Sequence, residues 1–353
     1  MLDRALHLQR GADDPNPKEL ANTWNLLGTL FWKTGRLDTA AAAQRTALDL
    51  RRRALPSHHE DLAYSYNDLG AVLYEAGKPE EAAPLYRKAL STMREQEEEK
   101  RLAITGLLNN LAGVYYDLGE WEKAEAKYRK VLARDRERFG PSHPHVAIDL
   151  SSLGLTLYEQ EKYDEAEEAL QRSLDIRRTE LDKTHPDVAI SLHNLAFVYM
   201  DTGRLEKSES AFQEALQIRQ RALDAPHPRI ASNLHGLGQL YREQGRPQKA
   251  ETYLRRAINM QNRLTGPESA DVAEMRVALA QLLAGQDRHD PALRHYRTAL
   301  AAYRPLSDTT HPTQQTVLTK LAAFYEAVGQ PAKASAYRDT LSRLYASEPI
   351  GSE

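Results

Sequence analysis

The chain of 353 residues contains no cysteine and has almost no excess of charge of either sign. Without cysteine there is no disulfide, no thiolate zinc site and no cysteine nucleophile. The 47 lysine and arginine residues are matched by 50 aspartate and glutamate residues, so no basic surplus is available to neutralise nucleic-acid phosphates. Runs of about 18 apolar residues, which a membrane span requires, are also absent, and the first ten residues lack the apolar core of a signal peptide. We therefore expect a cytoplasmic protein with no nucleic-acid partner and no membrane association.

A period of 42 residues runs through the sequence. Glycines in a turn context are separated by multiples of 42 and stand at Gly35, Gly77, Gly119, Gly203, Gly245 and Gly329. The same register predicts turns at Glu161 and Asp287. A leucine stands eight residues before every turn position, a small residue follows it, and a second small residue comes five positions after the turn, as in Leu27, Gly28 and Ala40.

Apolar residues recur at helical spacing on both sides of each turn position, which predicts a helix, a turn and a second helix in every unit. The small residues allow neighbouring helices to approach closely. Eight such units are expected over residues 21–346, with starts at 21, 63, 105, 147, 189, 231, 273 and 315.

One unit carries a family resemblance particularly clearly, in His185, Pro186, Asp187, Val188, Ala189, Leu192, Asn194, Leu195, Ala196 and Tyr199. These residues resemble the tetratricopeptide repeat, in the 42-residue form of kinesin light chains and their bacterial relatives, and the resemblance covers residues 21 to about 345. It implies an all-α, right-handed superhelical solenoid whose first helices line a concave groove. The long coiled coil by which kinesin light chains bind their motor has no counterpart, so we take the resemblance for the repeat and not for motor transport.

The ends and joints of the array carry further expectations. Residues 1–20 should form a lone half-repeat helix and a linker, either a cap or the end of a longer upstream array, and residues 347–353 a tail. Proline after histidine at 143, 185, 227 and 311 should start helices. The seventh unit is the most degenerate, with Gly285 two places early and Pro305 late in its second helix, and a local distortion or a hinge is expected there.

Two columns of residues on the first helices are candidates for the groove. Ten positions before each turn, the first six units offer asparagine, serine and histidine; three positions before it they offer mainly aromatic residues. Asparagine presents a donor and an acceptor and can hold a peptide backbone, while aromatic rings supply contact area. The candidate groove residues are Asn25, Trp32, Asn67, Tyr74, Asn109, Asn110, Tyr116, Ser151, Tyr158, His193, Asn194, His235 and Arg242.

The resemblance adds that first-helix asparagines contact cargo peptides in kinesin light chains, and the matching positions are Asn67, Asn109, Asn110 and Asn194. Ser151, His193 and His235 depart from that pattern. As an alternative, both columns hydrogen-bond and pack between adjacent units. Acidic residues beside the aromatic column either favour a basic ligand or pair with second-helix arginines. The acidic residues are Glu75, Asp117, Glu159, Asp201 and Glu243, and the arginines are Arg51, Arg177, Arg178 and Arg219.

Catalysis is not expected. The sequence has no glycine-rich phosphate loop, no Gly-x-Ser-x-Gly elbow and no His-Glu-x-x-His pair. Equivalent histidines of successive units are at least one helix-packing step of about 8 to 10 Å apart, whereas zinc needs nitrogens at about 2.0 to 2.1 Å. We therefore expect no catalytic residue, no cofactor and no metal, and a protein or peptide partner, with the oligomeric state open.

The favoured interpretation is a noncatalytic adaptor that binds a peptide or protein segment in the groove. The main alternative is a regulatory or sensor arm of a larger bacterial signalling or defence complex, with a kinase, a protease or a nucleotide-binding switch as its partner. Single-stranded RNA could stack on the aromatic column, but the acidic residues beside that column disfavour it. An enzyme in its own right would depend only on the polar groove residues.

Overall fold

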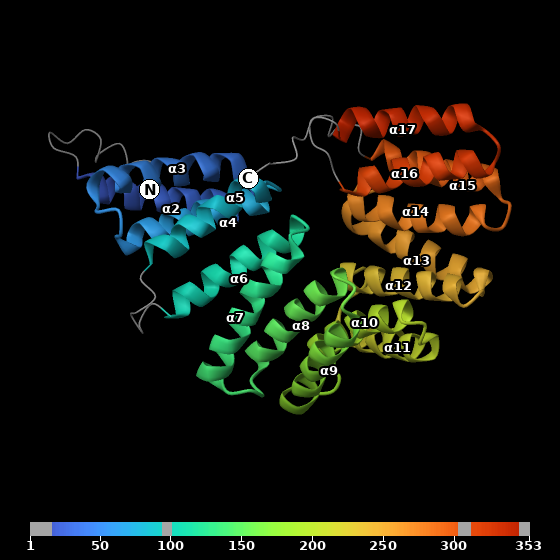
Figure 1. Ribbon diagram of the computed structural model, residues 1–353, viewed down its shortest axis with the longest axis horizontal. Helices are drawn as coiled ribbons and strands as arrows, with labels where there is room; N and C mark the ends of the chain where they lie inside the picture. The colour runs from blue at the N-terminus through green and yellow to red at the C-terminus, as the bar shows by residue number, and fades with distance from the viewer. Residues whose placement is uncertain (1–15, 94–100, 303–311, 346–353) are drawn as a thin grey trace. The chain divides into compact units, whose positions relative to one another are not determined.

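The computed structural model describes residues 16–93, 101–302 and 312–345, and all regular secondary structure in these ranges is α-helical. The expected helix over residues 1–10, the tail at 347–353 and Pro305 lie outside them. The helices (Figure 1) are α2 (Pro17–Lys33), α3 (Leu37–Ala54), α4 (Glu60–Glu75), α5 (Pro79–Thr92), α6 (Arg101–Asp117), α7 (Trp121–Phe139), α8 (Pro144–Glu159), α9 (Tyr163–Glu180), α10 (Pro186–Asp201), α11 (Leu205–Ala222), α12 (Pro228–Glu243), α13 (Pro247–Thr265), α14 (Ala270–Ala284), α15 (His289–Ala301), α16 (Pro312–Ala327) and α17 (Pro331–Tyr345).

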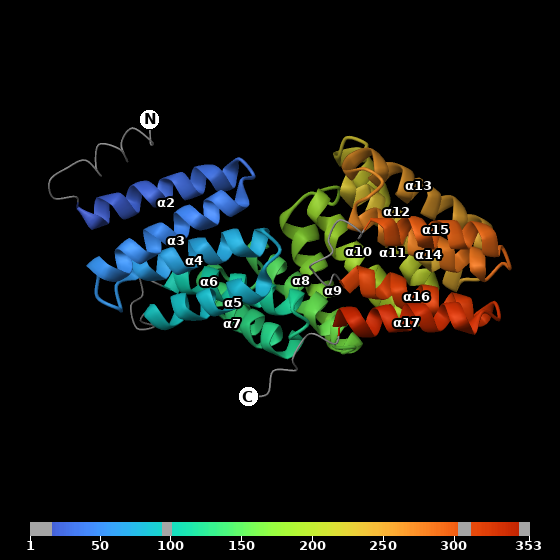
Figure 2. The same cartoon turned by 90° about the horizontal axis from the view of Figure 1, so that it is seen from above.

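The chain divides into two compact units, an N-terminal unit up to Ile176 and a C-terminal unit from Arg177. The division falls within α9. Within the N-terminal unit α2 packs on α3 and α4 on α5, and each second helix packs on the next first helix, so the pairs follow one another in Figures 1 and 2. The C-terminal unit repeats this scheme from α10 to α17. The predicted helix-turn-helix arrangement is confirmed.

The turns lie where the 42-residue register places them. The six turn glycines have φ between 66° and 74°, and the two predicted exceptions, Glu161 and Asp287, have φ of 59° and 58°. The hydrogen bonds match too: the residue after the turn donates its backbone N–H to the carbonyl five residues earlier, at 2.8 Å from Arg204 to Tyr199 and 3.0 Å from Lys162 to Leu157. Packing of the repeat therefore imposes the left-handed conformation even where glycine is missing.

Close helix contacts follow from the small residues. A Cβ atom added at Gly238 would lie 2.6 Å from Leu254 Cγ, and one added at Gly154 would lie 2.7 Å from Leu170 Cγ. Ala40 and Ala250, five positions after their turns, are completely buried. The sequence prediction of two tight contacts per unit is confirmed at these positions.

The linker histidines cap the helices that follow them. His59, His143, His185 and His227 each accept a hydrogen bond at Nδ1 from the backbone N–H two residues later, at 3.1 to 3.2 Å. Proline at the next position begins α8, α10 and α12, as predicted. The histidine itself thus satisfies one of the free donors at the helix start, a role that the sequence analysis had not assigned to it.

A buried arginine joins second helices to the first helices of the following units. Arg51 Nη1 donates to Ser65 Oγ at 2.6 Å, and Arg177 Nη1 donates to Ser191 Oγ at 2.7 Å. Arg219 donates to the Arg229 carbonyl at 2.8 Å and to Asn233 Oδ1 at 3.1 Å. These arginines stand 42 residues or a multiple of 42 apart, so they belong to the repeat.

The same joint is different in the middle of the N-terminal unit. Asp135 occupies the arginine position there, and Asp149 occupies the position of the serine that faces it. Burial and the neighbouring Asp135 carboxylate raise the pKa of Asp149, one of whose buried oxygens has no hydrogen-bond partner. Two carboxyl groups therefore replace a guanidinium–hydroxyl pair.

Candidate functional site

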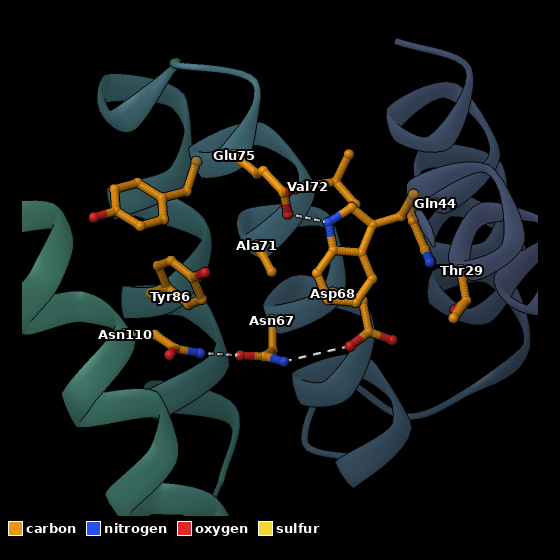
Figure 3. A pocket seen from close by; sticks show the side chains of 11 residues that line it. Thr29, Gln44, Asn67, Asp68, Ala71, Val72, Glu75, Tyr86 and Asn110 are labelled. Atoms are coloured by element: carbon orange, nitrogen blue, oxygen red, sulfur yellow. Dashed lines mark hydrogen bonds between the residues drawn. The ribbon is translucent and has the colours of Figure 1, made fainter. Parts of the chain in front are cut away.

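A pocket of about 570 Å³ lies among α2, α3, α4, α5 and α6, within the N-terminal unit. Figure 3 shows its side chains pointing toward one another from these helices. Four predicted groove residues line it, and seven further residues, among them the aliphatic Ala71 and Val72, complete its lining. The predicted residues are Trp32, Asn67, Tyr74 and Asn110.

An aromatic side chain of each of the first three units hydrogen-bonds a carboxylate of the next unit. Trp32 Nε1 donates to Glu75. Tyr74 OH donates to Asp117 Oδ2 at 2.6 Å, and Tyr116 OH donates to Glu159 Oε1 at 3.0 Å. In all three pairs the partners are 43 residues apart, so we call this series the aromatic–carboxylate ladder.

The ladder settles a question left open by the sequence. Glu75, Asp117 and Glu159 are bonded to the aromatic column, so the interpretation that second-helix arginines neutralise them is wrong for these three carboxylates. The second-helix arginines have other partners. Their guanidinium groups are buried against the next first helix or, for Arg178, bonded to Glu214 at 2.6 Å. Burial and the accepting carboxylates raise the pKa of Tyr74 and Tyr116, which keeps both phenols protonated as donors.

A row of amides crosses the pocket below the indole (Figure 3). Asn110 Nδ2 donates to Asn67 Oδ1 at 3.0 Å, and Asn67 Nδ2 donates to Asp68 Oδ1 at 3.3 Å. Burial raises the pKa of Asp68, and the hydrogen bonds from Asn67 and Asn25 partly offset that rise. Part of the asparagine column is thus engaged between units, while its polar atoms still line the pocket.

The remaining candidates of the N-terminal unit have several environments. Asn25 has a buried amide oxygen without a partner, Asn109 is exposed, and Tyr158 is half-buried. Ser151 does not line a surface, because its side chain is only 6% exposed and its Oγ lies 2.8 Å from Ser173 Oγ. The face proposed from the sequence therefore extends from the first unit to the third and changes character at Ser151.

In the C-terminal unit the equivalent column turns inward. His193 packs edge-on against Phe197 and Phe212, and its Nδ1 lies 3.4 Å from Arg219 Nη1. His235 is only 7% exposed, so it belongs to the core and not to a groove. Burial and the positive charge of Arg219 lower the pKa of His193 to about 3, and burial beside Arg242 lowers that of His235 to about 4. Both imidazoles are therefore neutral at physiological pH.

Two other candidates of the C-terminal unit remain partly accessible. Asn194 is half-buried on α10. Arg242 donates to Glu243 Oε1 at 2.9 Å and to Gln281 Oε1 at 3.3 Å. At Arg242 a guanidinium group thus takes the place of the aromatic donor found at Tyr74 and Tyr116.

Sequence analysis missed Gln44, Asp68 and Tyr86, all of which line the pocket. Gln44 and Tyr86 belong to second helices, whereas groove candidates had been sought on first helices. Asp68 follows Asn67 directly, and a signal for it existed: the register places it level with Asn110, the asparagine that was selected in the next unit.

Among the residues that the structure describes, no three histidine or acidic side chains come together in a way that could hold a metal ion. No helix in the described ranges combines the length and the apolar character of a membrane span.

Comparison with known proteins identifies the repeat. The family model of the tetratricopeptide repeat matches residues 19–95, 104–179, 187–263 and 250–304. None of the curated proteins compared with the chain matches it significantly.

Solved structures share the fold at low sequence identity. The apo form of the quorum sensor NprR from B. thuringiensis is 15% identical with a TM-score of 0.68, covering 86% of this chain and 81% of that one. The apo form of RapI is 19% identical with a TM-score of 0.63, covering 82% and 99%. BtubC (BKLC) from P. vanneervenii is 23% identical with a TM-score of 0.54, covering 65% and 92%. These likenesses show the fold and do not select the kinesin-light-chain form of the repeat.

Proposed function

We propose a function from one premise: the chain belongs to the tetratricopeptide-repeat family, whose members are protein-interaction scaffolds. The protein acts as a noncatalytic, cytoplasmic adaptor that binds a peptide or protein segment along the first-helix face of its N-terminal unit. This face is the one expected to be the concave side of the groove. The pocket among α2 to α6 is the observation that carries the proposal.

The chemistry of the pocket supports a peptide ligand. Its amide groups can donate to and accept from a peptide backbone whatever the sequence of the segment. Its aromatic side chains supply area, and such residues dominate the energetics of protein interfaces. The carboxylates of the aromatic–carboxylate ladder disfavour the alternative of an RNA ligand, because they repel phosphates.

The test compares the unaltered protein with variants of the pocket. Tagged full-length protein is used to capture partners from its own cells, and the partners are quantified by mass spectrometry. We expect Tyr74→Ala and the double variant Asn67→Ala with Asn110→Ala to lose the specific partner, while Asn259→Ala, on the exposed side of α13, retains it. Retention of every partner by pocket variants that melt normally would contradict the proposal.

A regulatory or sensor arm of a larger signalling or defence complex is the second candidate. Its support is the fold shared with NprR, which is described as a quorum sensor; at 15% identity this likeness is one of fold. The same capture experiment separates the two candidates. A partner that is a kinase, a protease or a nucleotide-binding protein, and whose activity changes when the adaptor is bound, favours the sensor arm.

A further inference from the structure

The pocket in the N-terminal unit has an unbalanced charge. Two carboxylates, Asp68 and Glu75, line it, and no lysine, arginine or histidine does. Glu75 accepts a hydrogen bond from the Trp32 indole. Asp68 accepts from Asn67 at 3.3 Å, and no cationic side chain in the described part of the chain forms an ion pair with it. Arg51, whose charge does act on Asp68, is engaged with Ser65 at 2.6 Å.

A second acceptor in the pocket lacks a donor. Gln44 is only 1% exposed, and its Oε1 has no hydrogen-bond partner. Its Nε2 is held by the Asn25 carbonyl at 3.3 Å, and the side chain packs over Gly28, where a Cβ atom would lie 2.7 Å from Nε2. The amide is therefore fixed with one acceptor unused. Buried acceptors without donors are costly, and native proteins rarely leave them so.

Three aromatic rings form another part of the wall, beside the smaller side chains of Thr29, Ala71 and Val72. Trp32, Tyr74 and Tyr86 line the same pocket, and Tyr86 is almost completely buried. The faces of such rings attract ammonium and guanidinium groups. Asp68, Gln44 and Tyr86 are all among the lining side chains in Figure 3. A carboxylate without a counter-ion, an unused amide oxygen and aromatic walls are the elements from which a cation site is built.

We propose that this pocket binds the cationic side chain of a lysine or arginine residue in the bound segment. The ammonium or guanidinium group donates to Asp68 and to Gln44 Oε1, and its alkyl stem lies between the aromatic rings. This inference rests on the proposed function, since the cation is part of a peptide or protein segment. With such a pocket, the first-helix face of the N-terminal unit prefers a segment that has a basic residue at the position that contacts α4.

The first experiment uses small probes, so that it does not depend on knowing the segment. Trp32 is made the sole tryptophan of the full-length chain by Trp24→Phe and Trp121→Phe, and its fluorescence is titrated with three probes. Nα-acetyl-lysine methylamide and Nα-acetyl-arginine methylamide should give saturable changes, and the tighter of the two identifies the preferred cation. Nα-acetyl-norleucine methylamide, which has the stem without the charge, should give none. An equal response to norleucine would overturn the proposal.

Two variants localise the effect. Asp68→Asn keeps the volume of the side chain and removes its charge, and should weaken binding of the cationic probes at least about tenfold, as expected for a lost hydrogen bond to a charged group. Gln44→Leu should weaken it less. Asp38→Asn is the matched control, because this carboxylate is almost fully exposed on α3. Unchanged binding by a folded Asp68→Asn protein would overturn the proposal, and if that variant fails to fold, unchanged binding by Gln44→Leu would do so.

The second experiment separates this inference from the proposed function. Random dodecapeptides displayed on phage are selected on the full-length protein and on Asp68→Asn. Enrichment of lysine or arginine on the unaltered protein alone supports both proposals. Peptides selected without such enrichment overturn the cation pocket and leave segment binding intact. If no peptide is selected while the lysine probe still binds at Trp32, segment binding is contradicted and the pocket is retained.

Discussion

The two units of the molecule are built from the same repeat but differ in where the side chains of one first-helix column lie. In the N-terminal unit the first-helix column holds Asn25, Asn67, Asn109 and the buried Ser151, and Asn67 lines a pocket next to aromatic donors. In the C-terminal unit the same column holds His193 and His235, whose rings are packed inward. In both units the repeat determines the path of the backbone and the close helix contacts made by the leucines and the small residues. A few side chains per unit decide whether the space beside the column is a pocket or part of the core.

The comparison also extends to charge. Burial raises the pKa of Asp149 in the N-terminal unit, whereas it lowers the pKa of His193, His235 and Arg219 in the C-terminal unit. Burial disfavours the charged form of each of these groups. The two units should therefore differ in how proton concentration and the loss of single polar groups affect their stability.

The largest effect is expected from removal of Arg219. This guanidinium is only 4% exposed and donates to the carbonyls of Arg229 and Ala189 and to the Asn233 side chain. Arg219→Ala leaves these acceptors buried without donors and should lower the free energy of unfolding by about 3 kcal/mol. Urea unfolding measures this loss of stability, and the control is Arg229→Ala, at a neighbouring residue that is exposed. Equal losses in both variants would contradict the role of the buried joint.

Acidification comes next and should act in opposite directions on the two units. The unfolded chain protonates its histidines near pH 6.5, whereas folded His235 does so only near pH 4. The unfolded state binds more protons in between, so stability falls as the pH drops below about 6.5, by about 2 kcal/mol at pH 5 for this group. The raised pKa of Asp149 changes the stability in the opposite direction, because here the folded state binds more protons than the unfolded state does. Its stabilising contribution is present at low pH and is lost as the pH rises above about 4.

Urea midpoints of the full chain at pH 7.5 and pH 5 test this prediction. His235→Asn gives the C-terminal unit the residue that the N-terminal unit has at this position, and it should remove that part of the acid loss. An identical acid loss in His235→Asn would show that burial of this imidazole does not govern the pH dependence.

Two substitutions should give the joint at Asp135 and Asp149 the same side chains as the joints that contain a buried arginine. Asp135→Arg combined with Asp149→Ser introduces the pair seen at Arg51 with Ser65 and at Arg177 with Ser191. The double variant gains a charged hydrogen bond and loses a buried carboxylate, and should be more stable by about 2 kcal/mol at pH 7.5. Thermal unfolding compares it with each single variant. A double variant no more stable than Asp149→Ser alone would mean that the arginine cannot form its bond here.

The smallest effect concerns the two turns without glycine, one in each unit. Glu161 and Asp287 have left-handed backbones, which disfavour side chains with a Cβ atom, although aspartate tolerates the conformation better than glutamate does. Glu161→Gly should stabilise the protein by about 0.5 to 1 kcal/mol and Asp287→Gly by less. Differential scanning calorimetry of the two variants decides the order, and a larger gain at Asp287 would contradict it.

Much of the fold could be predicted because its determinants are periodic. The register alone placed the turns at Glu161 and Asp287, where local preference would not have suggested them. Leucine and small-residue columns also predicted the tight contacts at Gly154 and Gly238. These features repeat because every unit meets the same neighbour, so a sequence averaged over eight copies carries a strong signal.

The site was less predictable because a column position does not specify what a side chain contacts. Asn67 and His235 occupy equivalent positions, yet one lines a pocket and the other is buried. The difference comes from the side chains around each position. Gln44 of α3 and Asp68 line the pocket together with Asn67, whereas His235 is only 7% exposed and lies within reach of the charge of Arg242 on its own helix. Likewise, the carboxylate of Asp117 could have met an arginine or a tyrosine, and only the paths of the side chains decide which.

The aromatic–carboxylate ladder has a consequence for how such a protein can change in length. Each of its bonds joins residues 43 positions apart, one more than the period, so every rung needs the unit that follows it in register. Removing or duplicating 42 residues as a block restores a donor opposite an acceptor, whereas an insertion of any other length inside a unit separates them. Growth and shrinkage of the array by whole modules thus preserve its cross-links, which agrees with the nearest-neighbour energetics of repeat proteins.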